Sequence, residues 1–399
     1  MPGTGQTYYV AGAGISGLTL ALALAKFGAH VVVLEKSPGV GEFGAGLQIS
    51  PNARRVLDSL GLDSAVAANS LEPKGIDVIP RDRSKPLVTL ELGAIMRERF
   101  GAPYVVMHRA DLAELLYNAT RRFANIDIQF GIKGWDAVSD AKGVTIIIDE
   151  QGDRTRTVRG RALIGADGVH SQTRTALLEG PAAHYHGRVA WRTLLPFDAA
   201  APHVALDRVT VLVAPRCHVV CYPLPHRQQV NVALFAPAEH PRAEHGTAPE
   251  IGGASLSPRL SGLLQAAGEN WTPWPLYAVE TSTWHRGNIG LLGDAAHAMV
   301  PFQAQGAAMG IEDAAILAPL LIDAPQAETA FARYEVLRRD RVTRVARVSA
   351  KNGSIFHMKW PMSAARDLVI RTHGSRGHLR RLDWLYGYDA LSFGVSTRT

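Results

Sequence analysis

Three closely spaced glycines near the start of the chain constrain its fold more than any other feature. Gly12, Gly14 and Gly17 follow the short apolar segment 7–11 and open a helical pattern, and a second apolar segment, 31–35, comes next. A strand, a glycine-rich turn, a helix and a second strand within about 30 residues form a βαβ unit, whose two strands are parallel. The sequence therefore predicts a Rossmann-like α/β domain at this end of the chain.

The spacing of these glycines is that of a dinucleotide-binding fingerprint. The first glycine permits a tight turn, the second lets the backbone approach a pyrophosphate, and the third allows close packing of the helix on the strands. The backbone N–H groups of Ile15, Ser16 and their neighbours would then face the phosphates. Glu35 follows Gly17 by about 20 residues and can accept hydrogen bonds from an adenosine ribose, with Lys36 beside it. The fingerprint alone does not separate NAD from FAD.

The rest of the chain predicts a second sheet and a helical end. Between 188 and 236, apolar runs alternate with Pro or polar turns, which is typical of an antiparallel sheet inserted into the first domain. These runs are 189–195, 209–213, 218–222 and 230–235. Segment 238–257 reads as a loop, and a helix is predicted at 306–321, with helical basic sequence to about 381. Further predicted elements of the first domain are the helix 109–122 and the strands 126–130, 144–148, 161–165 and 288–292.

Length and composition describe an ordinary globular protein. The 399 residues are 47% hydrophobic, which is enough for two intertwined domains. No apolar run reaches the ~18 residues of a membrane span, and the stretch 15–25 lacks the flanks of a signal peptide. The two cysteines, Cys217 and Cys221, are too few for a disulfide framework and poorly spaced for zinc, so no metal site is expected. We expect a cytoplasmic protein, monomeric or homodimeric.

The net charge of +6 is unevenly spread. Between 338 and 381, Lys and Arg greatly outnumber the acidic residues Asp340 and Asp367. The simplest interpretation is a solvated basic face of helices, and attraction of an anionic cofactor or substrate is an alternative. No recognised nucleic-acid-binding module accompanies the charge, so nucleic acid is not an expected partner.

Two later motifs each end an apolar strand and complete a pattern with the glycine fingerprint. They are Gly165-Ala-Asp167-Gly-Val-His-Ser-x-x-Arg174 and the segment from Gly293-Asp294 through Pro301 to Gln305-Gly306-Ala307 and Gly310-Ile-Glu-Asp-Ala314. Together, the three motifs resemble the flavoprotein aromatic hydroxylases, the family of p-hydroxybenzoate hydroxylase and salicylate hydroxylase, over almost the whole chain. The resemblance implies FAD as cofactor, NADH or NADPH as cosubstrate, and hydroxylation of a small aromatic substrate by O2 through a flavin C4a-hydroperoxide.

The same resemblance implies a fold of three parts. We expect an α/β fold with a Rossmann-like FAD-binding domain, an inserted antiparallel-sheet substrate domain and C-terminal helices. The expected bounds are 1–75, 105–180 and 284–325 for the FAD-binding domain, 76–104 and 181–283 for the substrate domain, and 326–399 for the helical region.

The resemblance also assigns roles toward FAD. Asp294 would contact the ribityl chain, Asp167 lies in a motif tied to both FAD and the nicotinamide, and Arg109 would reach the flavin side chain or the pyrophosphate. Gln48 is expected beside the cofactor. The hydroxynicotinate member of the family has a histidine at that place, which argues against a nicotinate substrate.

The second motif adds a helix start to these contacts. Gln305, Gly306 and Ala307 open a helix whose N-terminal N–H groups can stabilise negative charge at the N1–C2=O edge of a reduced flavin. Pro301 would shape the backbone beside the flavin and the substrate. His297 reads as a structural histidine rather than a catalytic one.

A candidate substrate site lies in the inserted sheet. His218 and Tyr222 alternate onto one face of a predicted strand, and Cys217 and Cys221 onto the other as packing residues. A polar outer face or an isolated core histidine would explain the same pattern. In the hydroxybenzoate and hydroxynicotinate hydroxylases of the family, the matching His and Tyr line the aromatic pocket, and Gln303 resembles a glutamine that contacts substrate there.

The chemistry expected of this site is activation of a phenol. A free phenol has a pKa near ~10, and its deprotonation strengthens the ring as a nucleophile. His218, with an intrinsic pKa near ~6.5, is the expected base, and Tyr222 the relay. Arg192, on the neighbouring predicted strand, would hold a substrate carboxylate, unless it points outward into solvent.

Three other functions share part of this pattern. A flavin monooxygenase of a non-phenolic or heteroaromatic substrate, such as a hydroxynicotinate, a quinolone or an antibiotic, would use the same FAD motifs. A flavin-dependent halogenase is disfavoured, because the segment 271–275 only superficially resembles a Trp-x-Trp-x-Ile-Pro motif. An FAD-binding redox sensor would need no aromatic pocket.

Overall fold

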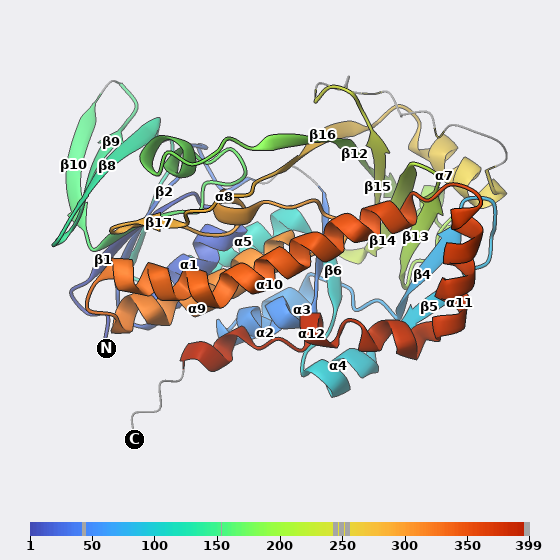
Figure 1. Cartoon of the computed structure of the whole chain (residues 1–399), viewed down its shortest axis with the longest axis horizontal. Coiled ribbons are helices and arrows are strands. Elements are labelled where there is room, and N and C mark those ends of the chain that lie inside the picture. The colour runs from blue at the N-terminus through green and yellow to red at the C-terminus, as the bar shows by residue number, and fades with distance from the viewer. Residues whose placement is uncertain (42–44, 153, 242–245, 247–250, 252–255, 395–399) are drawn as a thin grey trace.

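Two large sheets and two long helices organise the molecule (Figure 1). The computed structural model describes residues 1–41, 45–152, 154–241, 246, 251 and 256–394. A six-stranded sheet lies toward one end of the long axis and a seven-stranded sheet toward the other. Helix α10 (Ala327–Phe356) runs along the molecule and packs against α9 (Gly306–Asp323). The mixed α/β class predicted from the sequence is confirmed.

The predicted βαβ unit is also confirmed. Strand β1 (Thr7–Ala11), helix α1 (Ile15–Lys26) and strand β2 (His30–Leu34) follow one another, and the two strands pair in parallel. In space, their sheet has the order β17 (His285–Arg286), β18 (Ile289–Leu291), β11 (Ala162–Gly165), β1, β2 and β7 (Ile126–Gln129). The predicted strand 144–148 lies elsewhere, in a three-stranded antiparallel sheet of β10 (Thr155–Gly160), β9 (Gly143–Asp149) and β8 (Gly134–Asp140).

The four apolar runs of the second predicted sheet lie in β12 to β15, and their antiparallel pairing is confirmed. The sheet has the order β16 (Thr272–Ala278), β12 (His184–Pro196), β15 (Gln229–Pro237), β14 (Cys217–Leu224), β13 (Val209–Ala214), β4 (Gly75–Pro80) and β5 (Val88–Glu91). Strands β4 and β5 come from a much earlier segment, and β4 pairs with β13 in parallel. Cys217 and Cys221 pack on one face of the sheet with α7 (Pro258–Ala267). The domain boundaries stay a prediction.

Shorter elements connect these sheets. The helices are α2 (Pro51–Ser59), α3 (Asp63–Ala68), α4 (Ala94–Phe100), α5 (Arg109–Thr120), α6 (Phe197–Ala200), α8 (Asp294–His297), α11 (Met362–Arg380) and α12 (Asp383–Tyr386), with short turns η1 (Thr173–Leu177), η2 (Pro225–Arg227) and η3 (Ala390–Gly394). Strands β3 (Gly46–Ile49) and β6 (Val105–His108) form a separate pair. Most of the predicted loop 238–257 lies outside the described residues.

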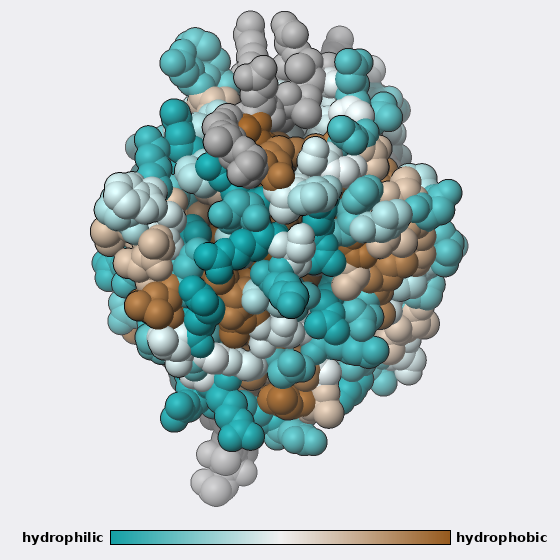
Figure 2. All heavy atoms as spheres, turned by 90° about the vertical axis from the view of Figure 1, so that its right-hand side faces the viewer, coloured by the Kyte–Doolittle hydropathy of each residue, from teal (hydrophilic) through white to brown (hydrophobic). Residues whose placement is uncertain are grey.

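The prediction of a solvated basic face is wrong for part of the C-terminal region. Three arginines of this region are buried, because each pairs with a carboxylate. Arg338 pairs with Glu312 and Asp313 of α9. Arg341 pairs with Glu312, and Arg366 with the neighbouring Asp367. At the end of the molecule that carries α11, hydrophilic side chains cover much of the surface and hydrophobic patches lie between them (Figure 2). Within the described ranges, no helix has the length and apolar character needed to span a membrane.

Candidate active site

The glycine fingerprint forms the tight turn that its spacing predicts. Gly12 has a φ of +108°, and a Cβ there would lie 2.5 Å from the backbone oxygen of Ala166. A Cβ on Gly17 would lie 2.0 Å from the backbone oxygen of Gly12. Gly14 is the N-cap residue of α1, and no side chain in the described part of the chain caps this helix start. Its N–H groups are therefore available to an anionic group such as a pyrophosphate.

The side chains of the two residues after Gly14 pack against the protein. Ile15 is buried. Ser16 is wedged between two glycines of the second motif, since a Cβ on Gly310 would lie 2.0 Å from the Ser16 Oγ atom and one on Gly293 would lie 2.7 Å from it. Only the backbone of Ile15 and Ser16 faces the turn, and the Ser16 side chain holds the start of α1 against α9.

The acidic residue at the end of β2 is tied to the glycine turn. Glu35 accepts hydrogen bonds from the backbone N–H groups of Ala13 and Ser37, both at 2.7 Å. Lys36 is exposed; it donates a hydrogen bond to Gln172 at 2.9 Å and lies over the Trp135 ring, 5.0 Å from its centroid. Glu35 therefore orders the turn through one oxygen and retains acceptor capacity for a ribose.

The Asp167 motif is connected to the Asp294 motif through an arginine. Asp167 accepts hydrogen bonds from the Ser171 hydroxyl at 2.6 Å and from the Thr173 backbone N–H at 2.9 Å. Arg174 is buried and donates to the backbone oxygen of Ala295 at 2.8 Å. The Asp167 carboxylate thus shapes its own loop, and Arg174 fixes that loop beside the residue that follows Asp294.

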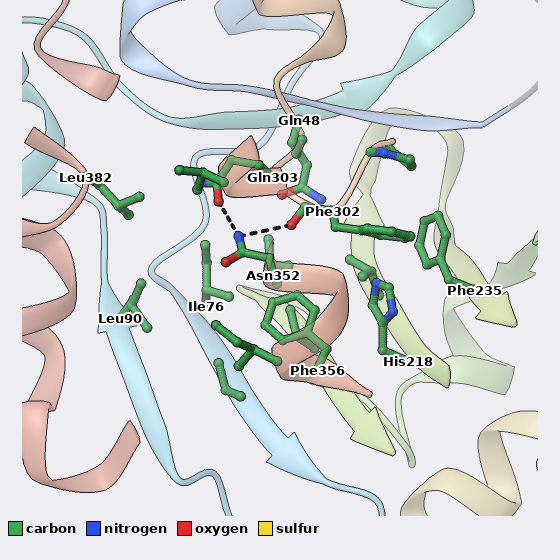
Figure 3. Close-up of a pocket in the computed structure, with 18 of the residues that line it drawn as sticks. Gln48, Ile76, Leu90, His218, Phe235, Phe302, Gln303, Asn352, Phe356 and Leu382 are labelled. Atoms are coloured by element: carbon green, nitrogen blue, oxygen red, sulfur yellow. Dashed lines mark hydrogen bonds between the residues drawn. The ribbon is translucent and has the colours of Figure 1, made fainter. Parts of the chain in front are cut away.

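A cavity of about 900 Å³ lies between the seven-stranded sheet, the start of α9 and helices α10 and α11 (Figure 3). It brings together many of the residues singled out in the sequence: Gln48, Arg109, Arg192, His218, Tyr222, Asp294, Pro301, Gln303, Gly306 and Ala307. The other predicted cofactor residues lie outside this cavity, on the glycine turn, after β2 and in the Asp167 loop, except Gln305, which precedes α9. The predicted residues therefore form two groups, one at each sheet.

One end of the cavity has the properties that a flavin ring and ribityl chain require. Asp294 is exposed although the residues around it are buried. Burial lowers the pKa of Arg109, and the nearby Asp294 carboxylate opposes that shift. Helix α9 begins at Gly306, where a Cβ would meet only Asp294, at 4.0 Å, and no described side chain caps it. An uncapped helix start, a carboxylate acceptor and open space fit FAD.

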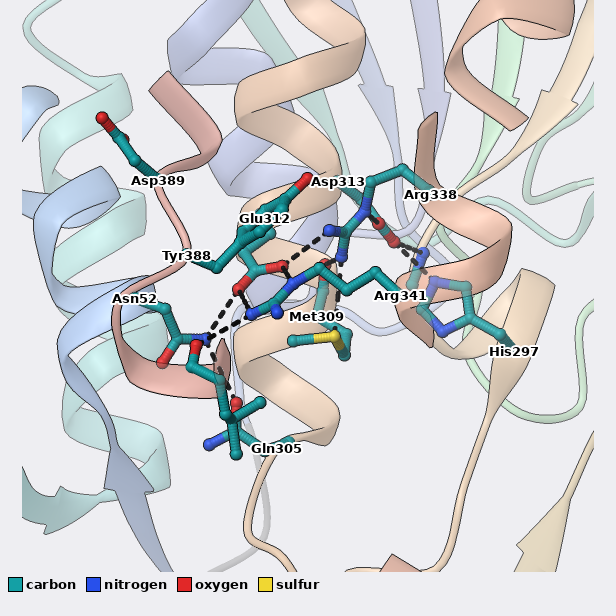
Figure 4. Close-up of polar contacts among 12 residues, drawn as sticks. Asn52, His297, Gln305, Met309, Glu312, Asp313, Arg338, Arg341, Tyr388 and Asp389 are labelled. Carbon is teal, nitrogen blue, oxygen red and sulfur yellow. Dashed lines mark hydrogen bonds and ion pairs between the residues drawn. The ribbon is translucent and has the colours of Figure 1, made fainter. Parts of the chain in front are cut away.

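Gln305 departs from its predicted role. Its side chain is buried and donates to the Ser50 hydroxyl at 2.8 Å, while Asn52 donates to its oxygen at 3.1 Å (Figure 4). The side chain therefore points away from the cavity, and only its backbone belongs to the start of α9. Ala304, one residue earlier, has a φ of +54°, an uncommon conformation for a residue with a Cβ.

A buried ionic network holds the beginning of α9 in place (Figure 4). Arg338 of α10 donates to Glu312 and to Asp313, both at 2.6 Å. Asp313 also accepts from the backbone N–H of Gly293 at 3.0 Å and lies 2.6 Å from His297 Nε2. Burial opposes ionisation of Asp313, but His297 and Arg338 lower its pKa to about 2. His297 is thus a partner of Asp313, in agreement with its structural interpretation.

At the other end of the cavity, His218 lies in an aromatic cluster. Its ring stacks on Phe235, with centroids 4.6 Å apart, and its Nδ1 atom is hydrogen-bonded to His357 Nε2 at 2.8 Å. Burial, together with His357 and Arg188, lowers the pKa of His218 well below its usual value. Burial also lowers the pKa of His357 to about 3. The surroundings of His218 therefore shift its pKa below the intrinsic imidazole value, and burial favours the neutral form of both rings.

The polar side chains near His218 come from two strands, the loop before α9 and helix α10. Burial lowers the pKa of the Arg192 guanidinium, and its Nε atom has no hydrogen-bond partner among the described residues. Burial raises the pKa of Tyr222, which the charge of Arg192 opposes. Gln303 accepts a hydrogen bond from Asn352 of α10 (Figure 3). Arg192 therefore faces the cavity rather than solvent, as a cation available to an anionic ligand.

Sequence reasoning missed four residues of this site. They are Tyr104, which donates a hydrogen bond to Gln48, the ring partner Phe235, Asn352 of α10, and His357, which follows the last residue of α10. None of them lies in a recognisable motif. Phe235 had the one usable signal, since it is on the strand next to His218 in an antiparallel register.

Together, this fold and this cavity define a flavin-dependent monooxygenase of aromatic rings. Residues 6–349 match the family model described as FAD binding domain, and the chain belongs to that family. It is 30% identical over 389 residues to "3-hydroxybenzoate 6-hydroxylase 1" of Aquipseudomonas alcaligenes, covering 96% of this chain and 98% of that protein. It is 33% identical over 401 residues to "3-amino-4-hydroxybenzoate 2-monooxygenase PtnB3" of Streptomyces platensis, covering 96% of each chain.

A solved structure supports the fold independently. The structure titled "Salicylate hydroxylase substrate complex" superposes with a TM-score of 0.76, at 21% identity, over 99% of this chain and 98% of that one. The expected architecture of an FAD-binding domain, an inserted sheet and C-terminal helices is therefore confirmed as a fold, and FAD is the cofactor of the family.

Replacing Arg338 by Met should destabilise the protein by about 3–5 kcal/mol, because buried Asp313 loses its arginine and buried Glu312 keeps only Arg341. We also expect FAD to be released at lower denaturant, since the network anchors the start of α9. Denaturant unfolding followed by flavin fluorescence measures both effects. The exposed Arg347 on the same helix is the control, and equal midpoints for Arg338→Met and Arg347→Met would contradict the role given to the network.

Replacing His357 by Gln should make the protein less sensitive to acid. The unfolded chain protonates this histidine below about pH 6.5, whereas the folded chain does not until the pH approaches about 3. The wild-type free energy of unfolding should therefore fall faster between pH 6.5 and pH 4, by up to about 1.4 kcal/mol per pH unit. Denaturant unfolding at several pH values tests this, with the exposed His226→Gln as control. Parallel curves for wild type and His357→Gln would refute it.

Proposed function

We propose that this monooxygenase hydroxylates a small phenolic carboxylate, such as a hydroxybenzoate or salicylate, with NADH or NADPH as electron donor and O2 as oxidant. One observation carries the proposal: a single cavity is lined both by Asp294 and the start of α9, which suit a flavin, and by His218, Tyr222 and Arg192, which suit a phenolic carboxylate. Two relatives whose names describe hydroxylation of hydroxybenzoates support it.

Bound FAD, once reduced by the nicotinamide, supplies activated oxygen to the substrate ring. The residues of the chain have to orient that ring, exclude water and move a proton. Asp294 and Arg109 would hold the ribityl side of the cofactor, and the N–H groups at Gly306 and Ala307 would face the ring edge that becomes negative on reduction.

Arg192 is the residue suited to orient the substrate. A guanidinium binds a carboxylate through paired hydrogen bonds, and such pairs strengthen where water is excluded. The Arg192 guanidinium lines the cavity and lies over the Trp274 ring, 5.9 Å from its centroid, with no carboxylate partner among the described residues. The phenol group of Tyr222 lies close enough to affect the charge of Arg192 and would complete the polar end of the site.

His218 is the residue suited to move the proton of a phenol. Its Nδ1 atom is used by His357, which leaves Nε2 for the substrate. Because burial makes a charged imidazole unfavourable, a proton taken up at Nε2 would be matched by transfer of the Nδ1 proton to His357 Nε2, and from there to solvent. The cations Arg109 and Arg192 would stabilise the phenolate. The rings of Phe235 and Phe302, packed around His218, would keep water from the reacting atoms.

The experiment that tests the function is an oxidation assay on purified, FAD-loaded protein. Salicylate, 3- and 4-hydroxybenzoate and 6-hydroxynicotinate are each added with NADH or NADPH, and O2 uptake and product mass are followed. A product heavier by one oxygen supports the proposal, and oxygen gain with loss of CO2 identifies decarboxylating hydroxylation. If no phenolic carboxylate is converted, the proposal fails in favour of a non-phenolic substrate.

In the same assay, His218→Ala should slow hydroxylation while FAD stays bound, because the phenol loses its proton acceptor. General acid–base groups contribute about 10²- to 10⁴-fold, which sets the expected loss of rate. His226→Ala, an exposed histidine just after β14, is the control. Full coupled turnover by His218→Ala would remove His218 from the mechanism.

Replacing Arg192 by Met should raise the KM for a phenolic carboxylate about 10- to 100-fold, the range expected for a lost charged hydrogen bond. A phenol without a carboxylate should bind wild type and variant about equally. Steady-state kinetics with both ligands measure the difference, and Arg159→Met on β10 is a control away from the cavity. A similar loss for both ligands would mean that Arg192 supports the fold rather than the carboxylate.

A further inference from the structure

One row of side chains crosses the floor of the cavity from strand to strand. Its members are direct cross-strand neighbours, and all of them line the cavity. From β12 to β5 they are Arg192, Ala233, Val220, Val211, Val78 and Val88. The row begins with a cation, continues with a small residue beside the strand of His218, and then consists only of valines.

The valine part of the row is longer than one aromatic ring needs. Neighbouring strands lie about 4.8 Å apart, so the distance from Val220 on β14 to Val88 on β5 is about 14 Å. A ring held between Arg192 and His218 covers only the part of the floor near Ala233 and Val220. A parallel row extends the same surface, since Val209 pairs with Ile76 and Ile76 with Leu90.

The far half of the cavity is aliphatic on its other walls as well. Figure 3 shows Ile76, Leu90 and Leu382 on the side opposite His218 and Phe235. Helix α11 adds the side chains of Ala365, Val369 and Ile370. Val78, Val88, Ile76 and Leu90 are only half-buried, although aliphatic side chains of a sheet usually find protein partners. Something apolar that enters the cavity would remove them from water.

The charged residues that line this half are engaged by the protein, apart from Lys351. Arg366 is held by Asp367 and by the backbone oxygens of Ile355 and Phe356. Arg381 donates to His373, and His378 is bonded to the backbone oxygen of Ile370. Lys351 is exposed on α10. The free donor capacity of Arg192 therefore lies at one end of the row, and the apolar surface at the other.

We propose that the substrate is an aromatic acid that carries an apolar substituent on the side of the ring away from its carboxylate. This inference deepens the proposed function and rests on it. The carboxylate binds Arg192, the ring lies over Ala233 and Val220 beside His218, and the substituent follows Val211, Val78 and Val88 toward α11. The substituent is a straight aliphatic chain or a second ring, para or meta to the carboxylate.

The test measures binding rather than turnover. FAD-loaded protein without nicotinamide is titrated with 3-hydroxybenzoate and with homologues that carry n-alkyl chains of one to four carbons at C4 or C5, and the flavin absorbance change gives Kd. Each buried methylene should lower Kd about fourfold. Chains at C2 or C6, next to the carboxylate, point away from the row and should bring no gain.

A variant in which a larger side chain blocks the row tests whether the alkyl chains bind there. Val78→Phe places a larger side chain in the middle of the row, and it should abolish the gain from the alkyl chains while 3-hydroxybenzoate binds as in wild type. Val336→Phe, at a position that is 79% exposed on α10, is the control and should leave both affinities unchanged. Thermal unfolding with FAD bound shows that the variants are folded, and Val88→Phe repeats the test should Val78→Phe be unstable.

The outcomes separate this inference from the proposed function. Equal or weaker binding of every longer homologue overturns it, and so does a gain that persists when the row is filled. Hydroxylation of 3-hydroxybenzoate without any gain from the chains leaves the proposed function standing and refutes the substituent. A gain that depends on Val78, without hydroxylation of any homologue, supports the binding mode and refutes the proposed function.

Discussion

The buried ion pairs between α9 and α10 are the constraint on which the site depends. Glu312 and Asp313 are fully buried, and a folded protein tolerates such carboxylates only where a cation meets them, here Arg338. Asp313 also accepts a hydrogen bond from the backbone of Gly293, so the same network holds the turn that presents Asp294. The uncapped start of α9 and the Asp294 carboxylate therefore keep a fixed relation to one another, before any ligand binds.

A single packing contact extends this fixed arrangement to the nucleotide end. Ser16, at the start of α1, fits between Gly293 and Gly310, and a side chain at either glycine would clash with the Ser16 hydroxyl. Two glycines of the second motif are thus required by packing and not by contact with a cofactor. An extended dinucleotide needs its phosphates and its reactive ring to be held at a set distance, and the crossing of α1 and α9 provides that distance from the protein side.

The sequence predicted the elements whose signal is local. The βαβ unit, the strands β12 to β15 and the start of α9 follow from glycine spacing and alternation, and the face shared by His218 and Tyr222 follows from the two-residue period of a strand. His357 was not predictable, because its contact with His218 depends on where a helix more than a hundred residues later ends. Gln305 was assigned to the cofactor from its motif, but its side chain turns toward Ser50, which no local pattern records. The burial of Arg338 was not predictable either, because its carboxylate partners Glu312 and Asp313 lie on another helix, α9.

The charges of the cavity explain why a neutral histidine stands where an ordinary base was expected. Arg109 and Arg192 bring positive charge to the wall of the cavity, and burial lowers the pKa of each, an effect that Asp294 opposes at Arg109 and Tyr222 at Arg192. A third cation at His218 would add repulsion, and Arg188 and His357 already disfavour it. An anionic ligand would be attracted to Arg192, whether it enters as a carboxylate or forms as a phenolate. The site is therefore organised to stabilise the deprotonated ring through its arginines, with the imidazole as the path by which the proton leaves.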